Sequence, residues 1–130
     1  MKYLLDTCAI IWLASEPDKL SKQILAKLVK EDASLHVSVI SVGEIACAYE
    51  RKRIELDRHW KHWIQYVLEV NGWEIIPIDY EIMTEAWSLP GEFHQDPADR
   101  IIVASARKRD LTIVSGDRKI LDYPHVKSCS

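Results

Sequence analysis

The stretch Lys2-Tyr3-Leu4-Leu5-Asp6 decides the fold of this chain. Its three consecutive apolar residues, Tyr3 to Leu5, are typical of a short strand of the kind buried in parallel sheets. The apolar segment Ala9 to Leu13 follows and predicts a short helix. Asp6 therefore lies at the junction between a buried strand and a helix.

The rest of the chain alternates between strand and helix patterns. Further strands are predicted at Leu35 to Ile40, Trp73 to Ile78 and Leu111 to Ser115, with a last one near Val126. Helices are predicted at Leu20 to Lys30, which is amphipathic, and at Ser41 to Arg53, Arg58 to Val70, Glu81 to Ser88 and Pro97 to Arg109. This alternation predicts an α/β fold whose mostly parallel sheet is covered by helices on both faces. The 130 residues fit one compact domain, residues 1–130.

Two helix starts carry capping patterns. Ser41-Val-Gly-Glu44 matches a capping box, which places Glu44 in the first turn of its helix. Asp96 suits the N-cap of the late helix, with Pro97 at its first position and Asp99 at its third. Taken singly, every such acid has this ordinary structural explanation.

Four acids gain a second interpretation from their common placement. Asp6, Glu44 and Asp117 fall after strands, and Asp99 opens the helix that leads into the fourth strand. The carboxyl ends of parallel strands form the ligand-binding edge of such sheets, so these side chains are expected to meet there. Their charges would repel one another unless a cation neutralised them. All-oxygen ligands select Mg²⁺ or Mn²⁺ over zinc, and such ions usually act on phosphates.

Composition sets limits on the remaining functions. A formal net charge of −3 argues against a general nucleic-acid coat protein. The start of the chain lacks a signal-peptide pattern and the apolar runs are too short to span a membrane, so the cytosol is the expected compartment. Three scattered cysteines predict reduced, mostly buried thiols rather than disulfides or a zinc site. The histidines, His94 among them, have no metal-ligand spacing and are expected on the surface or in loops.

Four segments carry a family resemblance when they are taken in order. They are Leu4 to Leu13, Ser38 to Ile45, His94 to Ala104 and Thr112 to Asp117. Each segment alone is a weak match, but four in the same order are specific. On these segments the sequence resembles the PIN-domain nucleases and, among them, the VapC-type toxins of bacterial toxin–antitoxin pairs. The match covers nearly the whole chain.

The resemblance implies a role for each acid and a set of partners. It makes Asp6, Glu44, Asp99 and Asp117 the four family acids around Mg²⁺ or Mn²⁺, and it adds Thr7, Asp96 and Ser115 as neighbours of the site. It also implies a Rossmann-like three-layer α/β/α fold, a homodimer, and inhibition by a VapB-like antitoxin that inserts a peptide into the active-site groove. The implied activity is an endoribonuclease whose products carry 5′-phosphate and 3′-hydroxyl groups.

An acidic groove needs positive charge nearby to hold RNA. Arg100 and Arg118 adjoin two of the proposed acids and are the preferred candidates for phosphate contact. The clusters Arg51-Lys-Arg53 and Arg107-Lys-Arg109 receive less weight, because cations near helix C-termini are favoured by the helix dipole.

Several other functions stay open at this point. A haloacid-dehalogenase-like phosphatase needs a second Asp two residues after the first, where this chain has Cys8. A receiver domain needs a phosphoacceptor Asp after its third strand and a late Lys, and neither is convincingly placed. A PIN-family RNA-processing or DNA-directed nuclease and a non-catalytic PIN-like RNA-binding module are the remaining alternatives. Mg²⁺-dependent cleavage of RNA would separate an enzyme from the binding module.

Overall fold

The computed structural model describes all residues, 1–130. Its strands are β1 (Lys2–Leu5), β2 (Ser34–Ser38), β3 (Glu74–Ile76), β4 (Thr112–Val114) and β5 (Ser128–Cys129). Its helices are α1 (Thr7–Ser15), a short 3-10 helix (Pro17–Lys19), α2 (Lys22–Leu28), α3 (Val39–Glu50), α4 (Trp60–Asn71), α5 (Tyr80–Ala86), α6 (Pro97–Arg109) and α7 (Arg118–Leu121). Every predicted strand and helix is therefore present, with most ends shifted by one to several residues.

The five strands form one sheet in the order β3-β2-β1-β4-β5, and every neighbouring pair is parallel. Strand β1 lies at the centre, where Tyr3 is in register with Leu35 of β2 on one side and with Thr112 of β4 on the other. The predicted mostly parallel sheet is confirmed. Because β1 is paired on both sides, the backbone position of Asp6 at its carboxyl end is fixed by two neighbours.

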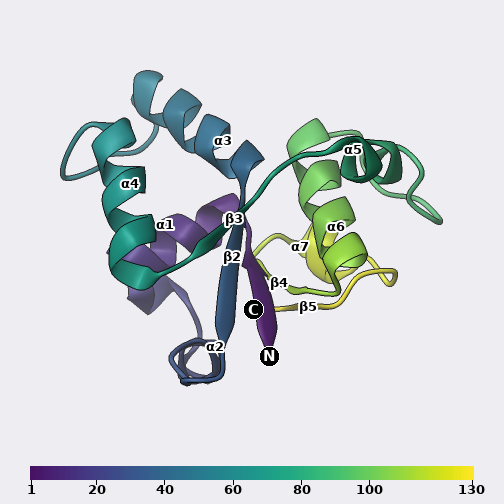
Figure 1. The fold of residues 1–130 in the computed structure, drawn as a ribbon, viewed down its shortest axis with the longest axis horizontal. Coiled ribbons are helices and arrows are strands. Elements are labelled where there is room, and N and C mark those ends of the chain that lie inside the picture. The colour runs from purple at the N-terminus through teal and green to yellow at the C-terminus, as the bar shows by residue number, and fades with distance from the viewer.

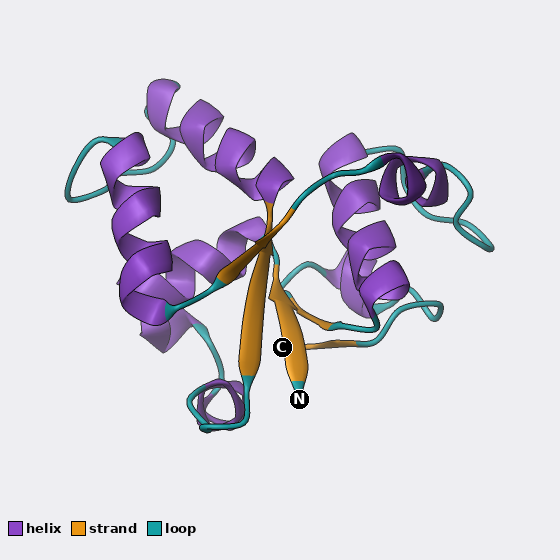
Figure 2. Cartoon of the chain, viewed as in Figure 1, coloured by secondary structure: helices purple, strands orange, loops and turns teal.

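Helices cover both faces of this sheet, so the molecule has the expected three layers (Figures 1 and 2). In Figure 1 the helices α1, α3 and α4 lie on the left of the strands and α5, α6 and α7 on the right. Two apolar cores result, and β1 contributes to both because its side chains alternate. Leu4 is buried against the α5 and α6 side, whereas Tyr3 and Leu5 are buried against the α1 and α4 side.

The start of α3 differs from the predicted capping box. Helix α3 begins at Val39, and its N-cap is Ser38, whose hydroxyl accepts a hydrogen bond from the Ile40 amide at 3.2 Å. The β-branched pair Val39-Ile40 favours a strand on local preference, but the Ser38 cap and the packing of Ile40 against the core override it. Ser41 and Glu44 thus lie inside the helix, with Glu44 in the second turn rather than the first.

The end of α4, the burial of the cysteines and the length of the apolar helices can also be compared with what the sequence predicts. Helix α4 ends at Gly72 in the left-handed conformation, as the Asn71-Gly72 pair predicts, with φ of 66°. The expectation of mostly buried cysteines is wrong, because Cys8 and Cys47 are exposed and Cys129 is half-buried. No helix of the structure is both long enough and apolar enough to cross a membrane.

Candidate active site

The four predicted acids line one groove of about 1000 Å³ at the carboxyl ends of the central strands. Asp6 follows β1, Glu44 lies in α3, Asp99 lies in the first turn of α6, and Asp117 precedes α7. Asp96 and Thr7 line the same groove. Residues from the first, middle and last parts of the chain are therefore brought together. We call this hollow the acidic groove.

Helix capping fixes three of the aspartates in place. Asp6 Oδ1 accepts a hydrogen bond from the Ala9 amide at 2.8 Å, and Asp117 Oδ1 accepts one from the Lys119 amide at 2.9 Å. Asp96 Oδ2 accepts one from the Asp99 amide at 3.0 Å, as its predicted N-cap position requires. Each cap uses one oxygen, so the second oxygen of each carboxylate is not bonded to a backbone amide.

Glu44 in α3 is held by the side chain of Thr7, the first residue of α1. The Thr7 hydroxyl contacts Glu44 Oε1 in a very short hydrogen bond and lies 2.9 Å from the Ser41 hydroxyl. Glu44 therefore does not cap α3, and its carboxylate is directed at the groove instead. Thr7 is placed beside the site, as the family resemblance implies.

Ser115 directly follows β4 and is buried. Its hydroxyl accepts a hydrogen bond from the Asp117 amide at 2.9 Å, which fixes the turn through Gly116. Hydrogen bonding from the same hydroxyl to the carboxylate of Asp6 lowers the pKa of that acid, against the larger effect of burial. Ser115 thus links two of the four acids.

Burial and mutual repulsion raise the pKa values of three groove acids. The pKa of Asp99 rises to about 7, first because it is partly buried and then because Asp96, Asp117, Glu44 and Asp6 surround it. Burial also raises the pKa of Asp6 and of Glu44, and neighbouring carboxylates add to both shifts. The acids therefore interact electrostatically, as like charges in a shared site do.

The donor set fits a hydrated Mg²⁺ or Mn²⁺ ion better than a closed metal centre. Nowhere in the chain do three His, Cys, Asp or Glu side chains form a ready cluster of ligands. Zinc in a structural site needs four such ligands, whereas Mg²⁺ keeps several waters and needs only one or two carboxylates. An open groove with separate, mutually repelling carboxylates meets that second requirement.

The walls of the acidic groove combine apolar and cationic residues. Ile11, Trp12, Ile40 and Ile54 supply an apolar surface beside the acids. Arg51 and Arg53, which received less weight in the sequence analysis, also line the groove. Cys8 and Cys47 are exposed because they too lie on groove-facing sides of α1 and α3.

The prediction that Arg100 contacts phosphate is wrong. Arg100 is buried, and its guanidinium donates hydrogen bonds to the carbonyls of Ala86 at 2.8 Å, Phe93 at 2.8 Å and His94 at 2.9 Å. Its Nε and Nη1 donors are used by carbonyls inside the protein, and Arg100 is not among the residues that line the acidic groove. Its position beside Asp99 in the sequence was misleading because successive helix residues point in different directions.

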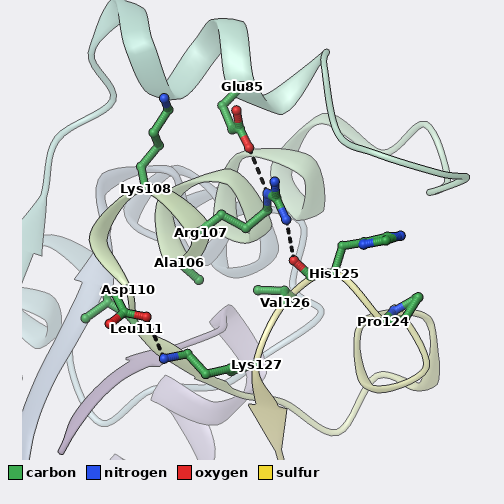
Figure 3. A pocket seen from close by; sticks show the side chains of 10 residues that line it. All are labelled: Glu85, Ala106, Arg107, Lys108, Asp110, Leu111, Pro124, His125, Val126 and Lys127. Carbon is green, nitrogen blue, oxygen red and sulfur yellow. Dashed lines mark hydrogen bonds and ion pairs between the residues drawn. The ribbon is translucent and has the colours of Figure 1, made fainter.

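Arg118 and the second basic cluster lie outside the acidic groove. Arg118 is exposed on α7 and is paired with Asp122 at 2.6 Å, so its contact with phosphate stays a prediction. Figure 3 shows Arg107 in a second hollow of about 640 Å³, near the amino ends of β4 and β5. There it is bonded to Glu85 and to the His125 carbonyl, while Lys127 pairs with Asp110. The charges of this hollow are largely paired with one another.

His94 is the one site residue that sequence reasoning missed. It lies in the loop before α6, as expected, but its side chain is mostly buried, with Nε2 3.0 Å from Asp99 Oδ2. Metal-ligand spacing could not reveal it, because its partner is a carboxylate. The pattern that could have revealed it is its place five residues before Asp99, inside one of the four family segments.

The fold and the groove together define an α/β protein with a carboxylate site at the strand ends, and comparison with known proteins gives the family. Residues 3–126 match the PIN domain, so the chain belongs to the PIN domain family. It is 31% identical over 122 residues to Ribonuclease VapC22 of Mycobacterium tuberculosis, covering 94% of this chain and 92% of that one.

Solved structures confirm the fold. The structure of VapBC2 from Rickettsia felis bound to a promoter DNA fragment matches with a TM-score of 0.74 at 17% identity, over 99% of this chain and 98% of that one. The DNA-bound VapBC structure from Salmonella typhimurium matches with a TM-score of 0.71 at 17% identity, over 99% and 97%. The predicted PIN fold, a Rossmann-like three-layer arrangement, is therefore confirmed.

Replacing Arg100 tests its structural role. We expect Arg100→Leu to lower the free energy of unfolding by roughly 3 to 5 kcal/mol, because three hydrogen bonds from a charged donor are lost. The matched change Arg109→Leu, at an exposed position of the same helix, is expected to cost less than about 0.5 kcal/mol. Urea denaturation measures both. Equal midpoints for the two variants would contradict the assignment.

The pKa of Asp99 predicts how the metal-free protein responds to pH. Since this pKa rises from 3.8 to about 7 on folding, the folded chain keeps a proton that the unfolded chain releases, and stability falls as pH rises through that interval. Asp99→Asn removes the effect. In EDTA we expect the variant to melt at a higher temperature than the wild type at pH 8, with little difference at pH 4.

The control for this experiment is Glu31→Gln, which changes an exposed carboxylate outside the groove. It is expected to leave the melting temperature nearly unchanged at both pH values. A gain for Asp99→Asn that is the same at pH 4 and pH 8 would show that repulsion in the groove is not its cause.

Proposed function

We propose that this chain is a metal-dependent endoribonuclease that hydrolyses RNA phosphodiester bonds and acts as the toxin of a toxin–antitoxin pair. The observation that carries the proposal is the groove that four carboxylates line together, where burial and the neighbouring charges raise the pKa of Asp99 to about 7. Membership of the PIN domain family supports it, as does the similarity over most of both chains to a protein named Ribonuclease VapC22.

The proposed metal ligands are the four groove acids, with Mg²⁺ or Mn²⁺ as the ion. Asp6 and Asp99 are the preferred direct ligands, and Glu44 and Asp117 bind directly or through water. When bound, the ion lowers the pKa of a water molecule and stabilises the charge that develops on the phosphate oxygens. The free oxygens of the capped aspartates support this assignment, because each can bind a second partner without losing its cap.

The proposed chemistry gives the protein residues two tasks. The caps and the Thr7 hydroxyl keep the carboxylates in fixed positions, so little reorganisation is needed when RNA binds. One of the groove carboxylates takes up the proton of the attacking water. The family resemblance implies products with 5′-phosphate and 3′-hydroxyl groups, so water rather than the RNA 2′-hydroxyl is the nucleophile. The new bond joins the water oxygen to phosphorus, the bond from phosphorus to the 3′-oxygen breaks, and the 3′-oxygen takes up a proton.

Arg51 and Arg53 are the proposed phosphate contacts within the acidic groove. Both are exposed, both line the hollow that holds the acids, and no ion pair occupies either of them. An RNA backbone running along the groove would place phosphates near these cations while one phosphodiester reaches the carboxylates. Arg118, on the far side of Asp117, is a further candidate.

The proposed partner is a VapB-like antitoxin. The matching structures from Rickettsia felis and Salmonella typhimurium are both of VapBC bound to DNA. The apolar wall of the groove, with Trp12 and Ile54, is suited to side chains of an inhibiting peptide. A homodimer stays a prediction from the family resemblance.

Asp6→Asn tests the proposed site with little effect on folding, since Asn is as good an N-cap as Asp. We expect cleavage of RNA in the presence of Mg²⁺ to fall by about 100-fold or more, because a carboxylate that holds the ion or its water is lost. EDTA is expected to abolish wild-type cleavage. A labelled RNA and a gel assay measure the rates. Near wild-type cleavage by a correctly folded Asp6→Asn protein would contradict the assignment of Asp6 to the proposed metal site.

Salt dependence tests the proposed phosphate contacts. In the non-cleaving Asp6→Asn background, we expect Arg51→Ala and Arg53→Ala each to reduce the slope of log K against log salt by about 0.7, the value for one contact to single-stranded nucleic acid. Fluorescence anisotropy with a labelled RNA gives the slope. Arg109→Ala, at the opposite end of α6 from Asp99, is the control. Slopes equal to that of the control would remove both arginines from the RNA path.

A further inference from the structure

We propose that His94 is a positioning residue, which holds the Asp99 carboxylate in the orientation that metal binding requires. The inference rests on the proposed function and adds to it a residue outside the four acids. The observation behind it is the contact of 3.0 Å between His94 Nε2 and Asp99 Oδ2.

This contact is protected from solvent and has no competitor. The side chains of His94 and Asp99 are only 24% and 21% exposed. No other hydrogen bond or ion pair reaches the Asp99 carboxylate, and the neighbouring cap between Asp96 and Asp99 uses the Asp99 amide rather than its side chain. One carboxylate oxygen of Asp99 is thus occupied by the imidazole, and Oδ1 is left for the groove.

Hydrogen bonds to the backbone and contacts between aromatic rings hold the loop that carries the His94 imidazole in a fixed position. Arg100 donates hydrogen bonds to the carbonyls of both Phe93 and His94, at 2.8 and 2.9 Å. The Phe93 ring lies 4.5 Å from the His94 ring and 4.9 Å from the ring of Tyr123, which is buried in the core. Arg100, the residue that follows Asp99 in the sequence, therefore holds the loop that places His94 against Asp99.

The contact is close, but its geometry is not that of a hydrogen bond. His94 Nε2 is fully buried and lacks a hydrogen-bond partner of good geometry, which makes it the only such side-chain atom in the chain. A buried donor without a partner costs free energy, so a small rotation of the Asp99 carboxylate toward the imidazole is favoured. Hydrogen bonds at catalytic sites often align only when the site is occupied.

This arrangement matches what a metal-binding carboxylate needs. Ligating carboxylates are commonly hydrogen-bonded by a second group that fixes their orientation, and loss of that group typically weakens metal affinity or activity by about 10-fold to 100-fold. His94 Nε2 lies at the required place, and it supplies the donor in the tautomer that carries the proton on Nε2. His62, in contrast, is exposed on α4 and contacts no groove acid.

Three variants separate the donor of His94 from its packing. His94→Phe keeps an aromatic ring against Phe93 but removes the donor, whereas His94→Gln keeps a donor and removes the ring. His62→Ala is the control. Each protein is first checked by circular dichroism and thermal melting, and its affinity for Mn²⁺ is then measured by titration calorimetry without RNA. The Mg²⁺ dependence of RNA cleavage is measured separately.

We expect His94→Phe to bind Mn²⁺ about tenfold or more weakly, His94→Gln to recover most of the affinity, and His62→Ala to equal the wild type. The concentration of Mg²⁺ needed for half-maximal cleavage should shift in the same order. If His94→Phe binds Mn²⁺ like the wild type, or if it exceeds His94→Gln, the ring serves packing alone and the inference is overturned. A wild-type chain that neither binds Mn²⁺ nor cleaves RNA instead overturns the proposed function, and the inference with it.

Discussion

The pairing of β1 on both sides is the constraint on which the rest of the structure depends. Strand β1 is in register with β2 and β4 at once, and its alternating side chains enter both cores, Leu4 on one face and Leu5 on the other. Both cores therefore pack against this strand. The chain leaves the sheet at Asp6, so the acid at the centre of the proposed site is positioned by the same backbone pairing that holds the layers together.

Capping interactions give the groove acids two roles at once. A helix start needs a side-chain acceptor, and Asp6, Asp96 and Asp117 supply it with one oxygen each. The same three acids line a common groove, where burial and repulsion raise the pKa of Asp99 to about 7. The protein therefore recovers part of the cost of collecting like charges through the helices that those charges stabilise. A divalent cation would remove the remaining repulsion.

Local sequence patterns predicted most of the strands, helices and groove acids. The features that they did not predict depend on long-range contacts. The strand before Asp6 and the Asp96-Pro97 helix start depend on neighbouring residues, so the sequence alone identifies them. The role of Arg100 depends on carbonyls of the preceding helix and loop, and the burial of His94 depends on that arginine in turn. The start of α3 at Val39 was missed because a serine cap and core packing outweigh β-branched preference. Such effects appear only when the tertiary structure is known.

The place of β1 in the sheet has a consequence for how the protein is made. The central strand is made before both of its partners, and one of them, β4, pairs with it through residues 112 to 114, more than a hundred residues later in the chain. Asp117 follows β4. A growing chain that still lacks these residues has an unpaired central strand and an incomplete groove. The proposed nuclease site is thus assembled only after β4 and Asp117 have been made, and any inhibitor that recognises the completed groove first meets it after that point.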